Sequence, residues 1–79
     1  MSFSEMTKDQ AYARSGGQCE CRRQDGLHYG RCSTRVPRRG PGVEYHHVHA
    51  DRLGGPDTLS NCEVLCPRCH AATASYGRH

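Results

Sequence analysis

The six cysteines of this 79-residue chain constrain its fold more than any other feature. Leu, Ile, Val and Phe together supply only nine side chains, about 11% of the chain, whereas charged chains below roughly 20% tend to stay disordered. A domain this small usually needs disulfides, a metal ion or a partner in order to fold. We therefore expect the cysteines, together with six histidines, to supply stability that the apolar core lacks.

The first residues of the sequence bear on how the cysteines are expected to be used. The first ten residues contain no apolar run, Met1 is typical of an initiator, and no stretch approaches membrane-spanning length. The sequence therefore predicts an intracellular, cytoplasmic protein without a membrane partner. Thiols in a reducing compartment stay free or bind metal, which favours zinc over disulfides. The alternative is a secreted miniprotein with oxidised cysteines and no metal.

Positive charge is concentrated in one segment. The formal net charge is only +3, yet six arginines and a single acid, Asp25, lie between residues 22 and 39. Ten of the eleven basic residues are arginine, whose planar guanidinium forms forked contacts to phosphate. The segment therefore indicates phosphate binding, with a solvated loop of incidental charge as the alternative.

In the amino-terminal half, helix-capping residues and residues that interrupt regular structure predict where a helix begins and ends. Thr7 and Gln10 fit a capping box that starts a helix, and Gly16-Gly17 ends it. The sequence Pro-Arg-Arg-Gly-Pro-Gly at 37–42 excludes a regular element there.

The carboxyl half is predicted to be strand, loop, strand and helix. Residues 43–48 are β-branched and aromatic between turn residues, and residues 62–65 form a second short strand. Pro67 suits the first position of a final helix that stops near Gly77.

The sequence Cys66-Pro67-Arg68-Cys69 forms a Cys-x-x-Cys knuckle, in which two thiolates converge on one tetrahedral zinc ion. Nothing upstream predicts the long strand and helix units of a thioredoxin-like redox fold, so metal binding is favoured. The two remaining ligands must come from Cys19, Cys21 and Cys32. Cys62 lies in an apolar context and is expected to be a small buried hydrophobe.

Two adjacent histidines, His46 and His47, lie in the first predicted strand, and His70 directly follows Cys69. Neighbouring residues of a regular strand point to opposite faces, so His46 and His47 are not expected to ligate the same ion. One of them can bind a metal ion while the other approaches the same substrate from another side. The zinc knuckle would anchor the helix that presents His70.

Three motifs together resemble the signature of the HNH nuclease family. They are Glu44-Tyr45-His46-His47-Val48, the stretch from Leu53 to Asn61, and Leu65-Cys66-Pro67-Arg68-Cys69-His70, with a looser match at Gly16-Gly17-Gln18-Cys19. The resemblance implies a small α+β, zinc-stabilised domain with a ββα-metal (His-Me finger) motif and an N-terminal helix. Residues 1–79 would form one nuclease domain: the helix and first zinc knuckle at about 7–32, an Arg/Pro/Gly-rich loop at 33–42 and the ββα-metal core at 43–77.

The resemblance also implies a metal-dependent DNA endonuclease that hydrolyses phosphodiester bonds. His46 and His70 would bind one divalent ion, and His47 would be the general base. Asn61 would orient His47 and brace the loop between the strands. Two protein ligands leave positions open for water and phosphate, and Mg²⁺, Mn²⁺, Co²⁺, Ni²⁺ or Zn²⁺ suits such a site.

Position matching to the family makes Cys19 and Cys32 the partners of the knuckle cysteines in a structural zinc site. The spacing departs from the family's usual Cys-x-x-Cys, so Cys21 stays an alternative ligand and His28 a weaker one.

DNA contacts are expected from guanidinium groups, those of Arg22, Arg23, Arg31, Arg35, Arg38, Arg39, Arg52 and Arg68. So small a chain has little surface for base readout, so binding should come from phosphate contacts and depend on salt. Nicking, double-strand cleavage by a homodimer and action beside a larger protein partner remain open. By analogy the chain resembles nucleases of phages or mobile elements.

A noncatalytic zinc-ribbon module that binds nucleic acid is the alternative function. It has no need of His46, His47, Asn61 and His70 in this register, so these four residues favour the nuclease.

Overall fold

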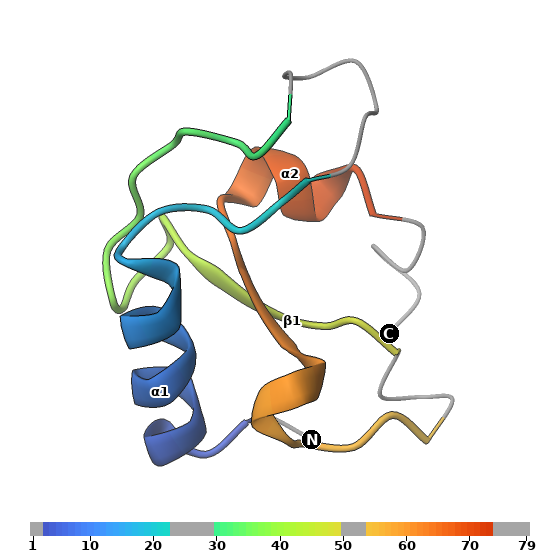
Figure 1. Cartoon of the computed structure of the whole chain (residues 1–79). Coiled ribbons are helices and arrows are strands. Elements are labelled where there is room, and N and C mark those ends of the chain that lie inside the picture. The colour runs from blue at the N-terminus through green and yellow to red at the C-terminus, as the bar shows by residue number, and fades with distance from the viewer. Residues whose placement is uncertain (1–2, 23–29, 50–53, 74–79) are drawn as a thin grey trace.

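The computed structural model describes residues 3–22, 30–49 and 54–73 of the chain. Its elements in chain order are α1 (Glu5–Ser15), β1 (Glu44–His47), the 3-10 helix η2 (Leu59–Asn61), β2 (Cys62–Leu65) and α2 (Pro67–Ala71). The two strands form an antiparallel sheet in which His46 pairs with Glu63 and His47 with Cys62. Helix α1 packs beside β2, and α2 lies at the far end of that strand (Figure 1). The small α+β fold agrees with the sequence prediction.

Helix α1 begins before the predicted cap at Thr7. The Ser4 hydroxyl is the cap, because it accepts the backbone N–H of Thr7 at 3.1 Å, and Glu5 places an acid in the first turn. Both residues are able to cap, and the earlier one gives the longer helix, so the predicted start was wrong. The helix ends as predicted at Gly16, whose φ of 67° is in the left-handed region.

Helix α2 ends at Ala71 and not near Gly77 as predicted. Thr73 closes its last turn, because the backbone N–H and the hydroxyl of Thr73 both donate to the His70 carbonyl, at 3.1 and 2.9 Å. Such local contacts take the place of further helical hydrogen bonds. Residues 74–79 lie outside the described part of the chain.

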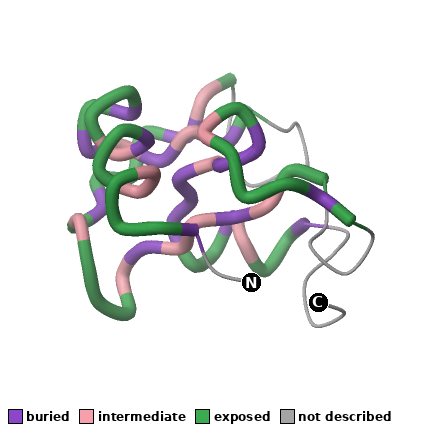
Figure 2. The backbone as a smooth tube through the Cα atoms, turned by 90° about the horizontal axis from the view of Figure 1, so that it is seen from below, coloured by how far each residue is buried: buried purple, intermediate pink, exposed green. Residues whose placement is uncertain are grey.

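The buried core is small, and cysteines make up much of it. Leu65, Val64 and four cysteines are the largest fully buried side chains among the described residues. Figure 2 shows short buried stretches alternating with exposed ones along the backbone. Neither helix in the described part of the chain has the length and apolar character needed to cross a bilayer.

An ion pair between Arg14 and Glu20 ties α1 to β2. The Arg14 guanidinium lies 2.6 Å from the Glu20 carboxylate and also donates to the Cys62 carbonyl at 2.6 Å. Glu20 in turn accepts the backbone N–H of Val64 at 2.9 Å. Burial opposes ionisation of Glu20, but the hydrogen bonds from Arg14 and Val64 hold its pKa below the ordinary value. This network fixes the segment that leads from α1 into the first cysteine.

Candidate functional site

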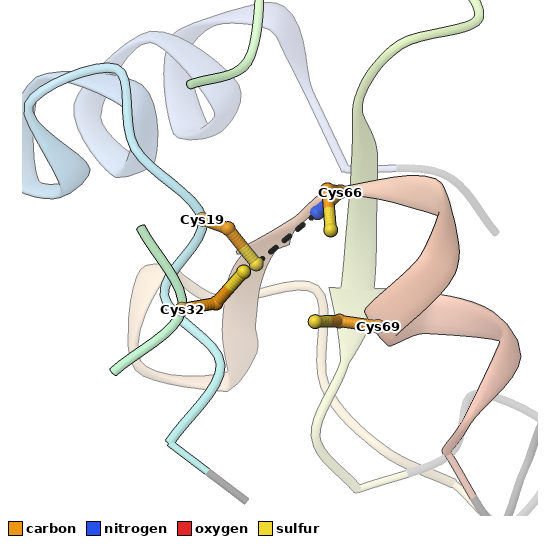
Figure 3. A group of neighbouring side chains, drawn as sticks. All are labelled: Cys19, Cys32, Cys66 and Cys69. Atoms are coloured by element: carbon orange, nitrogen blue, oxygen red, sulfur yellow. Dashed lines mark hydrogen bonds between the residues drawn. The ribbon is translucent and has the colours of Figure 1, made fainter. Parts of the chain in front are cut away.

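Four of the six cysteines bring their thiols together at one buried point. The Sγ atoms of Cys19, Cys32, Cys66 and Cys69 all lie within 4.8 Å of one another, and all four residues are buried (Figure 3). Cys19 and Cys32 come from two loop segments that pair through backbone hydrogen bonds. Cys66 and Cys69 come from the end of β2 and the first turn of α2. The cluster therefore joins the amino-terminal loops to the sheet and helix.

The geometry of this cysteine cluster fits a tetrahedral zinc ion. Zn–S bonds of about 2.3 Å place the four sulfurs of a tetrahedral site roughly 3.8 Å from one another. The four sulfurs here lie within 4.8 Å of one another, so a small contraction would bring them to that spacing. The Cys66 backbone N–H donates to the Cys19 sulfur at 3.2 Å, a contact that favours the thiolate (Figure 3). The buried cluster of four cysteines therefore indicates a structural zinc ion.

Burial opposes ionisation of these thiols. It raises the pKa of Cys19 to about 11, and it raises the pKa of Cys69 as well. Burial also acts against ionisation of Cys32, but hydrogen bonds with Thr34 outweigh it and lower that pKa to about 6. Four thiolates in one buried site would repel one another, so a cation is needed to hold them all deprotonated.

The other two cysteines, Cys21 and Cys62, are buried as well. Cys21 contacts Cys69, and its backbone carbonyl accepts the N–H of Cys32 at 2.8 Å. Cys62 starts β2, and burial raises its pKa to about 11, in agreement with a neutral, apolar role. The four converging thiols include that of Cys19 and not that of Cys21. Cys21 stays the alternative zinc ligand.

His46 and His70 come together between β1 and α2. His46 is buried, and its ring meets that of His70 edge-on, with centroids 5.4 Å apart and planes at 70°. Glu44, two residues earlier on the same face of β1, places Oε1 4.0 Å from Nδ1 of His70. Glu44 was assigned no role from the sequence. Because Glu44 and His46 are two residues apart in a predicted strand, their side chains were already expected on the same face of that strand.

His47 contacts a different part of the molecule. Its Nε2 lies 2.6 Å from Oδ1 of Asp57, and its ring stacks on Phe3 with centroids 4.0 Å apart. The opposite facing of His46 and His47 agrees with the strand alternation predicted from sequence. Both partners of His47 were missed, because Phe3 precedes the first helix and Asp57 was treated as part of a spacer loop.

Asn61 anchors the loop that connects β1 to η2. Its side-chain oxygen accepts the backbone N–H of His49 at 2.7 Å, and its amide donates to the carbonyls of His49 and Pro56 at 3.1 and 2.8 Å. These contacts correspond to the bracing role that the family resemblance implies. Orientation of His47 by Asn61 stays a prediction.

One arginine of the basic segment is bound within the fold. Arg31 donates from Nε to the carbonyl of Cys19 at 3.0 Å, and from Nη2 to the carbonyls of Ser15 and Gln18 at 2.7 and 3.0 Å. Its guanidinium therefore satisfies the backbone of the segment between α1 and the cysteine cluster.

Other arginines of the segment pair with acids of α1. Arg38 lies 2.7 Å from Asp9 and 3.2 Å from Glu5, and Arg39 also pairs with Glu5. Among the residues expected to contact DNA, the exposed ones include Arg22, Arg35, Arg39 and Arg68. Arg23, Arg52 and the weaker zinc candidate His28 lie outside the described residues.

The hairpin followed by a helix, with adjacent histidines on its first strand and a Cys-x-x-Cys-His sequence at the helix start, is the arrangement of a ββα-metal nuclease. A family model described as HNH endonuclease matches residues 30–75, more than half of the chain. The protein therefore belongs to the HNH endonuclease family.

A shorter likeness connects the chain to a restriction enzyme. Over 30 residues it is 53% identical to the type IV methyl-directed restriction enzyme EcoKMcrA of Escherichia coli strain K12. This match covers 38% of the chain but only 11% of that enzyme. No solved structure matches the chain.

Proposed function

We propose that the protein is a metal-dependent DNA endonuclease in which His47 is the general base and His46 and His70 hold one divalent ion. The position of these side chains carries the proposal. The rings of His46 and His70 contact each other edge-on between β1 and α2. The side chain of His47 points to the opposite face of β1, where it stacks on Phe3. Membership of the HNH endonuclease family, whose members act on DNA, supports the same assignment.

The donor atoms between β1 and α2 fit a divalent ion. Two imidazoles suit Zn²⁺, Ni²⁺ or Co²⁺, and the Glu44 carboxylate near His70 adds an oxygen that also suits Mn²⁺ or Mg²⁺. When bound, the ion would polarise the scissile phosphate and stabilise negative charge on the leaving oxygen.

His47 is suited to deprotonate a water molecule. Its side chain is 14% exposed, so solvent reaches the ring while Asp57 holds one ring nitrogen. A neutral imidazole takes the proton, the water oxygen bonds to phosphorus, and the bond from phosphorus to the leaving oxygen breaks.

Exposed arginines are proposed to bind the DNA backbone. Replacing Arg35 and Arg39 together with alanine should weaken binding to every DNA sequence and flatten the plot of log affinity against log salt by about one unit per lost phosphate contact. The matched control replaces both with lysine, which keeps the charge and should largely keep the slope. Fluorescence anisotropy over a salt series measures it. An unchanged slope in the alanine variant would assign both residues to a solvated loop.

The function itself is tested by incubating supercoiled plasmid with the protein and a panel of divalent ions. We expect cleavage that requires a divalent ion, with nicked or linear product showing how many strands are cut. Because EcoKMcrA is named as methyl-directed, DNA with and without methylated bases is compared. Failure to cleave either DNA with any ion would leave the zinc-ribbon nucleic-acid-binding module as the better account.

A further inference from the structure

The imidazole of His47 is restrained along one edge and over one face. Asp57 contacts its Nε2, and the Phe3 ring lies almost parallel to it, with an angle of 19° between the planes. Phe3 is only 4% exposed and belongs to the buried core, so it shields the face of the partly exposed His47 ring that it covers. We propose that Asp57 is a positioning residue that fixes the tautomer of His47 and leaves Nδ1 as the nitrogen that accepts the proton from water. This inference rests on the proposed role of His47 as general base.

The chemistry of the two side chains selects the tautomer. An ionised carboxylate only accepts hydrogen bonds, whereas a neutral imidazole has one N–H donor and one nitrogen acceptor. At 2.6 Å from Oδ1, Nε2 must carry the hydrogen, because the other tautomer would place two acceptors against each other. The lone pair of the neutral ring is then on Nδ1. Asp57 thus decides which nitrogen is basic, in the way that carboxylate partners orient other functional histidines.

The loop around Asp57 is held by Asn61. The Asn61 amide donates to the carbonyl of Pro56, the residue directly before Asp57, at 2.8 Å. Its two hydrogen bonds with the His49 backbone hold the other end of the same loop. Asn61 is therefore connected to His47 through the backbone that carries Asp57. This path gives the asparagine an effect on His47 that needs no direct contact with the ring.

Kinetics of two substitutions at Asp57 provide the first test. Asp57→Ala removes the acceptor and should lower kcat by about tenfold or more while leaving KM, zinc content and divalent-ion affinity within about twofold. Asp57→Asn keeps an oxygen that accepts from Nε2–H and should retain more of kcat than the alanine variant. Asp9→Ala is the matched control, because it removes an acidic side chain of α1 that also forms an ion pair, with Arg38, but lies away from His47 in the contacts of the described residues. Loss of divalent-ion affinity in Asp57→Ala would overturn the proposal and make Asp57 a metal ligand.

Two further measurements separate positioning from a general structural role. In a His47→Ala background, Asp57→Ala should cause no additional loss of cleavage, because it acts through the missing ring. An equal loss in both backgrounds would overturn the proposal. Nitrogen-15 NMR of the neutral His47 ring should show hydrogen on Nε2 in the parent and a shifted tautomer ratio in Asp57→Ala, and an unchanged ratio would contradict it. The NMR result does not depend on cleavage. If the parent protein fails to cut DNA, the proposed function is rejected, but the NMR measurement still tests whether Asp57 fixes the tautomer of His47.

Discussion

Replacing Cys66 with serine should leave the chain unfolded at room temperature. Zinc binding contributes roughly 10 kcal/mol or more to folding in comparable small peptides, which equals the whole stability of many domains. The described core contains little apolar surface that could compensate for the loss of zinc. Its largest fully buried side chains are Leu65, Val64, Cys19, Cys21, Cys32 and Cys69. Chelation of zinc from the parent protein should have the same effect. Far-ultraviolet circular dichroism together with metal analysis measures both results.

The matched control for this experiment is Cys62→Ser. Cys62 is also buried, but its thiol lies outside the four that converge, so this variant should keep its zinc and remain folded. Substitutions at Cys32 and Cys21 then test the ligand set. Full zinc content in Cys32→Ser with loss of zinc in Cys21→Ser would show that the cluster uses Cys21 instead.

Replacing His47 with alanine should lower plasmid cleavage by roughly 100-fold or more, which is the scale expected for loss of a general base. The variant should keep divalent-ion affinity and DNA affinity, because those contacts are assigned to other side chains. His46→Ala and His70→Ala should lose cleavage for a different reason, namely loss of the catalytic ion, with partial recovery at high metal concentration. Isothermal titration with the divalent ion, alongside the cleavage assay, distinguishes the two classes of variant.

Zinc content and the unfolding midpoint of each histidine variant serve as controls, because His70 follows a proposed zinc ligand directly. A His47→Ala protein that cuts as fast as the parent with the same ion would reject His47 as the base. Unchanged ion affinity in His46→Ala and His70→Ala would reject the metal assignment, while leaving the base assignment intact.

The local signals in the sequence predicted most of the fold. Strand β2 has the predicted bounds, β1 lies within the predicted 43–48, and Gly16 ends α1 because a left-handed residue is needed there. The two wrong boundaries were set by hydroxyl groups, since Ser4 caps α1 earlier than Thr7 and Thr73 closes α2 early. Several hydroxyls in one stretch each offer a cap or a stop, and sequence alone does not rank them.

The candidate site was predictable only where spacing fixes geometry. Strand alternation separated His46 from His47, and the family pattern grouped Cys19 with the later cysteines. The partnership of His47 with Asp57 depends on the path of a loop, which no periodic pattern describes. The same holds for Arg31, because a charged side chain that binds three backbone carbonyls looks in the sequence like any other basic residue.

Cys69 and His70 are neighbours in a helix of five residues, which is too short to be stable without tertiary contacts. If the first binds zinc and the second the catalytic ion, the two metal affinities are thermodynamically linked, and each ion tightens the binding of the other by the same factor. Zinc would then act as an effector of the nuclease as well as a structural element. A cell poor in zinc would hold less active enzyme even where the catalytic ion is abundant.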